Sequence, residues 1–238
     1  MTNSREGMVS VILPTYNEKD NVVPLIREIH ACLNGYEHEI LVMDDNSPDG
    51  TMQAVEDLSL PFVTGIRRLG DPGLAASIVD GIRSASGARV VVMDSDFDHD
   101  PRHLPFMIQQ LEAHDCVVAS RFLQDGSSGS FRLVLSRIFN MFVRAATGSR
   151  MTDNLYGYFA VRREVLFRLP LETIFRGYGD YFIRFLCALQ DRGFRVRQFP
   201  ARHVPRRTRG HVRLIGVFGQ YVLTTLRLAL RRRAHGYV

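Results

Sequence analysis

The sequence predicts an α/β protein built on a mostly parallel sheet with helices on both faces. Short runs rich in valine and isoleucine recur along residues 8–121, segments with helical spacing of apolar residues separate them, and polar turns follow several of the runs. Strands and helices that alternate in this way form parallel sheets, because each helix supplies the crossover that a parallel pair of strands needs.

Residues 8–121 are predicted to form five strands with four helices between and after them. The first run is apolar, rich in β-branched residues and ended by a proline, which is typical of a buried strand. Apolar residues recur on one face of the helix that follows, and a later helix opens with Asp71 and Pro72, which favour a first helical turn. The predicted strands are 8–14, 39–43, 61–66, 88–93 and 115–121, and the helices are 17–33, one that begins at 51, 71–85 and 103–113.

The pattern changes beyond Arg121. A Gly- and Ser-rich segment and an arginine-rich segment are predicted loops, over 123–132 and 203–213. No internal repeat is present. The remaining predicted elements are an amphipathic helix over 132–148, a short strand that runs into a helix over 154–166, a helix over 180–193, a strand over 194–200 and a final apolar helix over 214–233.

The composition restricts the class of protein. Of the 238 residues 45% are hydrophobic, which indicates a globular chain rather than a disordered one. Acidic residues concentrate in 37–57 and 94–100, and arginines dominate the last third. Cys32, Cys116 and Cys187 form no CxxC pair and are interpreted as core residues in a reducing compartment. With no signal sequence and no stretch of ~18–20 apolar residues, we expect a cytoplasmic or peripheral protein.

Four aspartates, Asp94, Asp96, Asp98 and Asp100, follow directly on a run of valines. Like charges gathered in one site are costly, so a bound cation would explain them. Hard cations such as Mg²⁺ or Mn²⁺ take carboxylate oxygens, and parallel sheets bind ligands beyond the carboxyl ends of their strands. Alternation along an extended segment would place Asp94, Asp96 and Asp98 on one side. The alternative is a solvated acidic turn. Unless metals intervene, an acidic site at the strand ends would repel a nucleic-acid backbone, so no nucleic-acid partner is expected.

Four segments in this order resemble glycosyltransferase family 2, whose members have the GT-A fold: residues 9–22, 39–51, 90–101 and 117–122. Within that family they look most similar to the dolichol-phosphate mannose synthase branch, the polyprenyl-phosphate glycosyltransferases. The likeness extends through residues 153–166 and the basic segment 206–213. The resemblance implies a Rossmann-like GT-A sheet with an additional C-terminal amphipathic helix.

The resemblance assigns four residues to the nucleotide sugar. Pro14, Tyr16 and Glu18 would line the nucleotide pocket, and Asp45 would also contact the nucleoside. The alternative for the acidic turn that contains Asp45 and Asp49 is an Asx-type turn that caps the following helix, and this interpretation suits Asp49 best.

The resemblance also implies metal ligands. Asp94 and Asp96 would be the DxD pair that holds Mg²⁺ or Mn²⁺ and the diphosphate, with Asp96 part of the catalytic machinery. Asp98 stands where the branch commonly has glutamine and would be a third ligand. Three histidines lack the spacing of a zinc site and are interpreted as surface residues: His99, His103 and His203.

Four arginines are implied at the phosphates. Arg121 follows the fifth predicted strand and would face phosphate, and Arg132 lies on the acceptor loop. Arg209 and Arg213 match the basic loop that closes on the nucleotide phosphates. The alternative for Arg121 is a surface ion pair, and for Arg132 it is the solvated face of a helix.

The implied function is inverting, metal-dependent transfer of a sugar from a nucleotide sugar, GDP-mannose or a UDP-sugar, to a polyprenyl phosphate. An ionised phosphate needs no general base. The chain departs from the branch at several positions, which weakens the acceptor assignment. Asn154 replaces a proline, Tyr156 stands where serine is frequent, His211 replaces an acidic residue, and Arg213 replaces a lysine.

Asp180 keeps a second hypothesis open. Other family 2 members have an aspartate in a similar segment as the base for a hydroxyl or amine acceptor, so Asp180 would then serve a soluble acceptor. A structural alternative is that Asp180 caps the helix that begins at Tyr181. A minor alternative for the whole chain is a catalytically silent module that binds sugar nucleotides.

The chain is predicted to divide into a catalytic domain, residues 1–210, and a C-terminal amphipathic helix, residues 211–238. Three arginines at 231–233 close the apolar helix, which suits attachment to an anionic membrane surface. The alternative is a helix docked on its own domain or on a dimer partner. The sequence leaves the oligomeric state open.

Overall fold

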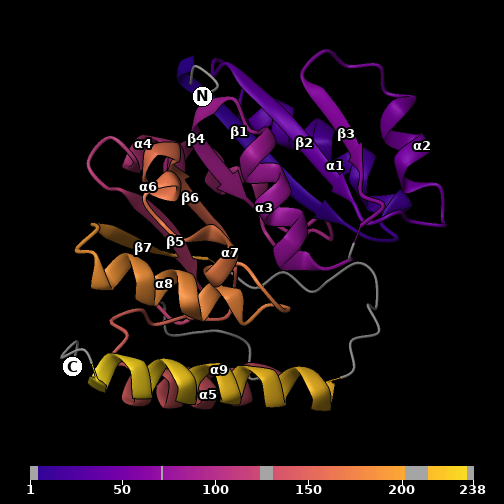
Figure 1. The fold of residues 1–238 in the computed structure, drawn as a ribbon. Helices are drawn as coiled ribbons and strands as arrows, with labels where there is room; N and C mark the ends of the chain where they lie inside the picture. Colours follow the sequence, from indigo (N-terminus) through magenta and orange to yellow (C-terminus); the bar gives the residue numbers. More distant parts are fainter. Residues whose placement is uncertain (1–4, 71, 124–130, 202–213, 235–238) are drawn as a thin grey trace.

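The computed structural model describes residues 5–70, 72–123, 131–201 and 214–234, with the backbone alone at 5, 6, 132 and 214–217. Within these residues seven strands form one sheet in the order β3-β2-β1-β4-β6-β5-β7 (Figure 1). Their bounds are β1 (Arg5–Thr15), β2 (His38–Asp44), β3 (Val63–Arg67), β4 (Gly87–Val92), β5 (Cys116–Ser120), β6 (Phe159–Arg162) and β7 (Val196–Pro200).

The predicted fold class is confirmed. Every neighbouring pair of strands is parallel except the two that β6 makes, because β6 runs antiparallel between β4 and β5. The helices are α1 (Lys19–Cys32), α2 (Thr51–Glu56), α3 (Leu74–Ser84), α4 (Leu104–Gln110), α5 (Phe131–Thr147), α6 (Arg163–Phe167), α7 (Leu171–Ile174), α8 (Tyr181–Asp191) and α9 (Leu214–Ala234), with a 3₁₀ turn at Pro101–His103.

Two apolar layers cover the two faces of the sheet. Alternation along β1 sends Val9, Val11 and Leu13 to one face, where α1, α2 and α4 cover them, and Ile12 to the other, under α3, α6 and α8. Because β1 lies inside the sheet, between β2 and β4, these four side chains are fully buried. The sheet therefore has a rigid centre, and its polar loops lie at the carboxyl ends of β1, β2 and β4.

The helices α5 and α9 lie side by side below the sheet (Figure 1), and α9 also packs on α8. The C-terminal helix is thus docked on its own chain, which was one of the two interpretations of the sequence. The domain boundary after residue 210 stays a prediction. No helix in the described part of the chain has the length and hydropathy of a segment that crosses a bilayer.

The three arginines at the end of α9 do not share one environment. Arg231 and Arg233 are exposed, but Arg232 is buried and pairs with Asp191 of α8, with Nη2 2.5 Å from Oδ1. The expectation that all three face an anionic surface is wrong for Arg232. Its position two turns beyond Thr225 places it on the buried face of the helix.

Gly87 is required where β4 begins beside β1. A Cβ on Gly87 would lie 2.7 Å from the Met8 carbonyl oxygen and 2.9 Å from the Ser10 nitrogen, both backbone atoms of β1. We expect Gly87→Ala to lower the free energy of unfolding by about 2 kcal/mol, because neither strand can move aside without breaking the sheet. Urea denaturation followed by circular dichroism measures this.

Gly70→Ala is the matched control, since no atom lies within 4 Å of a Cβ built at Gly70. Its unfolding midpoint should equal that of the parent chain. Equal midpoints for the Gly87 and Gly70 variants would show that β1 and β4 accommodate the added methyl group.

Candidate functional site

The loop after β1 brings the predicted nucleotide residues to one edge of the sheet. Pro14 is buried in β1, and its carbonyl oxygen accepts a hydrogen bond from Ser95 Oγ at 2.9 Å. Tyr16 is 58% exposed just beyond it. Glu18 begins α1 and accepts a hydrogen bond from Asn21 Nδ2 at 2.7 Å. The structure therefore places Pro14, Tyr16 and Glu18 together, beside the loop that contains Ser95.

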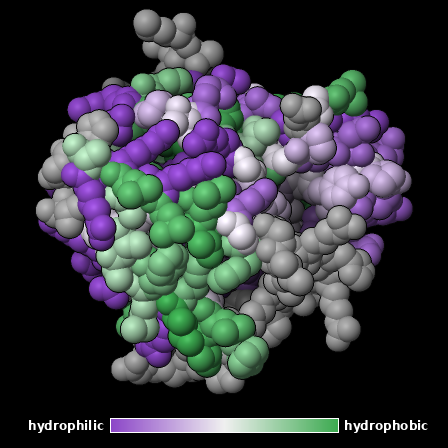
Figure 2. All heavy atoms as spheres, turned by 60° about the horizontal axis from the view of Figure 1, so that its bottom comes forward, coloured by the Kyte–Doolittle hydropathy of each residue, from purple (hydrophilic) through white to green (hydrophobic). Residues whose placement is uncertain are grey.

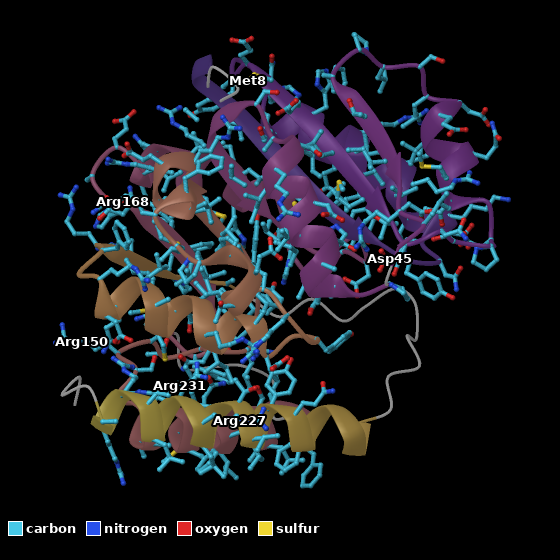
Figure 3. All side chains as sticks on the ribbon, in the orientation of Figure 1. Met8, Asp45, Arg150, Arg168, Arg227 and Arg231 are labelled. Atoms are coloured by element: carbon cyan, nitrogen blue, oxygen red, sulfur yellow. The ribbon has the colours of Figure 1, made fainter. Side chains whose placement is uncertain are left out.

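Asp45 lies at the end of β2, at the lower edge of the sheet in Figure 3. Its carboxylate pairs with the Arg68 guanidinium and accepts hydrogen bonds from the Gly73 N–H at 2.7 Å and Ser77 Oγ at 2.9 Å. Arg68 also pairs with Asp80, at 2.8 Å. Asp45 thus holds the start of α3 against the end of β2, and its charge is balanced by Arg68, a residue that sequence reasoning missed.

The Asx-type turn at Asp49 is confirmed, although Gly50, and not Asp49, is the N-cap residue of α2. Asp49 Oδ1 accepts a hydrogen bond from the Thr51 N–H at 2.9 Å, and Asp49 Oδ2 accepts one from the Lys19 N–H at 3.1 Å. Burial alone would raise the pKa of the Asp49 carboxyl, but these hydrogen bonds lower it below its usual value. Asp49 therefore ties the loop after β2 to the start of α1.

The acidic residues after β4 form a turn and not an extended segment. β4 ends at Val92, and Phe97, whose side chain is buried, has φ of +65°. The extended segment expected from the sequence is absent, because residues 95–99 form bends, but Asp94 and Asp98 are still brought close together. Asp96 Oδ1 accepts a hydrogen bond from the Asp98 N–H at 3.1 Å.

His99 supports the turn from inside the protein, so its interpretation as a surface residue is wrong. Its side chain is fully buried and stacks on Tyr158 with ring centroids 4.7 Å apart. Nδ1 accepts a hydrogen bond from the Asp94 N–H at 2.8 Å, so Nε2 carries the proton and donates to the Tyr156 carbonyl oxygen at 3.0 Å. Because both ring nitrogens are engaged, His99 is not available as a metal ligand.

Two tyrosines from the segment that leads into β6 bind the same turn. Tyr156 donates its hydroxyl to the Asp98 carbonyl oxygen at 2.7 Å, and Tyr158 donates to the Asp100 carbonyl oxygen at 3.0 Å. Tyr156 is one of the positions where the sequence departs from the branch it resembles. The structure gives that residue a role, since it fixes the backbone that carries Asp98.

The geometry of the turn fits a hard divalent cation. Ligand atoms of Asp94 and Asp98 lie within 4.8 Å of each other. Opposite ligands of an octahedral Mg²⁺ with bonds of about 2.1 Å are about 4.2 Å apart, so a small side-chain rotation would bring both carboxylates onto one ion. The carboxylates, rather than the engaged imidazole of His99, are the donors that such an ion prefers.

Arg121 lies next to the turn, with its side chain 13% exposed. Its guanidinium makes two hydrogen bonds to Asp153, from Nε at 2.7 Å and from Nη2 at 3.0 Å, and it lies over the Tyr156 ring at 4.8 Å. Burial opposes the charge of Arg121, but Asp153 outweighs that effect and raises the pKa of the guanidinium. The alternative of an ion pair is confirmed, although this pair is largely buried and not on the surface.

Asp180 lies at the first residue before α8 but does not cap the helix with its side chain. Oδ1 accepts a hydrogen bond from the Tyr178 N–H at 3.0 Å, and Oδ2 pairs with Arg184 Nη1 at 2.6 Å. Asp180 is therefore the N-cap residue of α8 by position, but its side chain makes no cap hydrogen bond to the helix. The Arg132 side chain and all of Arg209 and Arg213 lie outside the described residues, so their predicted roles remain predictions.

Comparisons with known proteins agree with this architecture. The profile described as "Glycosyl transferase family 2" matches residues 10–169. A dolichol-phosphate mannosyltransferase of Pyrococcus furiosus is 36% identical over 173 residues, which are 70% of this chain and 49% of that protein. A polyprenol monophosphomannose synthase of Mycolicibacterium smegmatis is 37% identical over 176 residues, 69% of this chain and 65% of that protein. The chain thus spans between half and two thirds of the length of these relatives.

Solved structures show the same fold at lower identity. Glucosyl-3-phosphoglycerate synthase of Mycobacterium tuberculosis, in a complex with Mn²⁺, uridine diphosphate and phosphoglyceric acid, matches with a TM-score of 0.74 at 22% identity and covers 93% of this chain and 78% of that one. Its complex with Mg²⁺ and uridine diphosphate matches with a TM-score of 0.71 at 22% identity, over 93% and 79% of the two chains.

The fold is thus that of the GT-A glycosyltransferases. The chain belongs to glycosyl transferase family 2, as its sequence predicted.

The hydroxyl of Tyr156 should contribute to cation binding. Tyr156→Phe removes one hydrogen bond to the backbone of Asp98, and a bond of this kind contributes about 1 kcal/mol. We therefore expect the variant to bind Mn²⁺ about fivefold more weakly, as measured by isothermal titration calorimetry of the protein without nucleotide. Tyr36→Phe, at the opposite edge of the sheet, should bind like the parent chain. Identical affinity of all three proteins would show that the hydroxyl does not hold the turn.

Proposed function

We propose that the protein is a metal-dependent, inverting glycosyltransferase that moves a sugar from a nucleotide sugar to a polyprenyl phosphate. The acidic turn after β4 carries this proposal, because it gathers carboxylates at the carboxyl end of a parallel strand, beside the loop of Pro14 and Tyr16. The names of the two curated relatives support the acceptor and favour a mannosyl donor. The donor is therefore GDP-mannose in the first instance, with a UDP-sugar as the other candidate.

Different residues around the turn would bind the nucleoside and the diphosphate of the donor. Pro14, Tyr16 and Glu18 hold the nucleoside, with the Asp45–Arg68 pair as a rigid wall of the pocket. A Mg²⁺ or Mn²⁺ ion held by Asp94 and Asp98, together with Asp96, supplies positive charge to the leaving diphosphate. The backbone hydrogen bonds from Tyr156 and to His99 keep the carboxylates in place.

The transfer is a single displacement. An oxygen of the acceptor phosphate forms a bond to the anomeric carbon while the bond to the nucleoside diphosphate breaks, so the configuration inverts. The acceptor oxygen is already ionised and has no proton to lose. Positive charge near the phosphates stabilises the transition state, and Arg132, Arg209 and Arg213 are proposed for this role together with Arg121.

The helix pair α5–α9 would place the protein on a membrane that holds the lipid acceptor. Figure 2, which brings the bottom of Figure 1 forward, shows hydrophobic side chains gathered over a broad area of this face. Figure 3 shows Arg227 and Arg231 along α9. Apolar side chains that enter the interface, with arginines at the headgroups, suit an anionic surface. The exposed residues are Phe131, Val134, Leu135, Ile138, Met141 and Phe142 of α5 and Phe218, Leu223, Leu226 and Leu230 of α9.

The metal assignment is tested by removal of one carboxylate at a time. Asp94→Asn, Asp96→Asn and Asp98→Asn should each lower the transfer of mannose from GDP-mannose to polyprenyl phosphate by about 10²-fold or more, because a direct ligand is lost. Asp57→Asn, an exposed position after α2, is the control and should be fully active. Normal turnover in all three site variants would show that the acidic turn takes no part in the transfer.

Membrane attachment is tested by liposome sedimentation. We expect the double variant Ile138→Gln, Met141→Gln to bind vesicles with anionic lipid at least tenfold more weakly, since both side chains are about 60% exposed on α5 and would enter the interface. Leu69→Gln is the matched control, because Leu69 is 81% exposed but lies after β3, away from the helix pair. If the parent chain stays in the supernatant, the membrane assignment is wrong.

A further inference from the structure

We propose that Asp180 is a positioning residue that fixes α9 beside the acidic turn, so that α9 forms the acceptor-side wall of the site. The acceptor part of this inference rests on the proposed function. The fixing of α9 does not, because it follows from contacts within the chain. Three observations carry it, namely a closed polar cluster, a close approach at Gly179 and a second anchor at the far end of α8.

The polar cluster joins α8 to α9. Asp180 Oδ2 accepts two hydrogen bonds, from Arg184 Nη1 at 2.6 Å and from Thr224 Oγ1 at 2.8 Å. Arg184 Nη1 also donates a hydrogen bond to Thr224 Oγ1, at 3.0 Å. Arg184 is further fixed by hydrogen bonds to the carbonyl oxygens of Ile174, at 2.8 Å from Nε, and Arg176. Both charged side chains are buried. Thr224 is the one residue of α9 in this cluster, so its hydroxyl is the link between the two helices.

The turn before α8 is shaped to receive α9. The Tyr221 hydroxyl lies directly against Gly179, so any side chain at Gly179 would collide with it. Gly177 has φ of +75°, a conformation that suits glycine, and a Cβ there would lie 2.8 Å from Asp180 Oδ1. One helical turn of α9, from Tyr221 to Thr224, therefore fits the segment from Gly177 to Asp180.

A second anchor lies at the other end of α8. Arg232 pairs with Asp191 and donates a hydrogen bond to Cys187 Sγ at 3.4 Å. Between the two anchors, Ile183 and Cys187 form a small apolar cluster with Val143 of α5. α9 is thus held along the length of α8, with the Thr224 anchor at the end that lies toward the site.

The start of α8, where α9 is fixed, lies against the segment that holds the acidic turn. A Cβ at Gly157 would lie 3.2 Å from the Tyr181 hydroxyl, and Gly157 follows Tyr156, which donates a hydrogen bond to the Asp98 carbonyl oxygen. Burial raises the pKa of Tyr221, and the charges of Tyr178, Asp180 and Asp94 raise it further. Asp94 also raises the pKa of Tyr181, the first residue of α8, after burial as the main cause. The contact at Gly157 and these charge effects place the start of α8 beside the acidic turn, so in this proposal α9, fixed to that end of α8, bounds the space beside the turn.

The same contacts argue against Asp180 as a general base. Both of its oxygens accept hydrogen bonds from protein donors, and one of these donors is an arginine that stays protonated. To take a proton from an acceptor hydroxyl, the carboxylate would have to leave this pair. Thr224 distinguishes the two roles of Asp180. A positioning role requires the Thr224 hydroxyl, whereas a role as general base does not.

The experiment compares Thr224→Val with Thr225→Val, two substitutions of the same chemistry at adjacent positions. The Thr225 hydroxyl donates a hydrogen bond to the Tyr221 carbonyl oxygen of its own helix, at 2.8 Å, and within the described part of the chain it makes no bond to α8. In the free protein, hydrogen–deuterium exchange of residues 218–230 should rise about tenfold in Thr224→Val, stay normal in Thr224→Ser and change little in Thr225→Val. Unchanged exchange in Thr224→Val would overturn the proposal. This arm needs no substrate, so it decides the fixing of α9 even if polyprenyl phosphate is not an acceptor.

Steady-state kinetics supply the second arm, with Asp180→Asn, Thr224→Val and the double variant. We expect KM for polyprenyl phosphate to rise about tenfold in each, with KM for GDP-mannose and kcat within about threefold of the parent values, and no further loss in the double variant. The opposite pattern, a fall of kcat by roughly 10²–10⁴ in Asp180→Asn with normal kinetics in Thr224→Val, is that of a lost base and would overturn the proposal.

Discussion

Four carboxylates in one turn repel one another, and much of the architecture around β4 counters that repulsion. The backbone of the turn receives hydrogen bonds from the hydroxyls of Tyr156 and Tyr158 and gives one to the imidazole of His99. The Arg121 guanidinium lies beside it and raises the local positive charge, with Asp153 as its partner. The acidic turn is stable because neutral donors and the Arg121–Asp153 pair surround it, and because Asp100 pairs with Arg102 at 2.7 Å.

The antiparallel strand β6 explains how these donors reach the turn. Phe159 of β6 pairs with Val92, the last residue of β4, so the residues just before β6 run beside the residues just after β4. A parallel strand in this place would bring its carboxyl end, not its amino end, to the site. One reversed strand in an otherwise parallel sheet therefore places 153–158 against the acidic turn.

The sequence predicted the alternation of strands and helices and the edge of the sheet where the site lies, because both follow from apolar periodicity. It did not predict the shape of the turn, since a left-handed backbone at Phe97 leaves no trace in composition and is rare for a bulky residue. The pairs Asp45–Arg68 and Asp180–Thr224 join residues far apart along the chain, so spacing could not reveal them. The inward position of Arg232 could have been predicted from the sequence, because helical spacing puts Arg232 on the same face as Thr225 and Ala229, which are buried.

Phe97 belongs to the acidic turn through its backbone and to the main apolar core through its side chain. The arrangement of the carboxylates is consequently completed when the core folds, and not when a ligand arrives. The repulsion among the negative charges is overcome during folding, so a cation would meet a preorganised set of oxygens and would lose little affinity to rearrangement. The same coupling means that an unfolded chain offers no comparable site, so cation binding would favour the folded state by mass action.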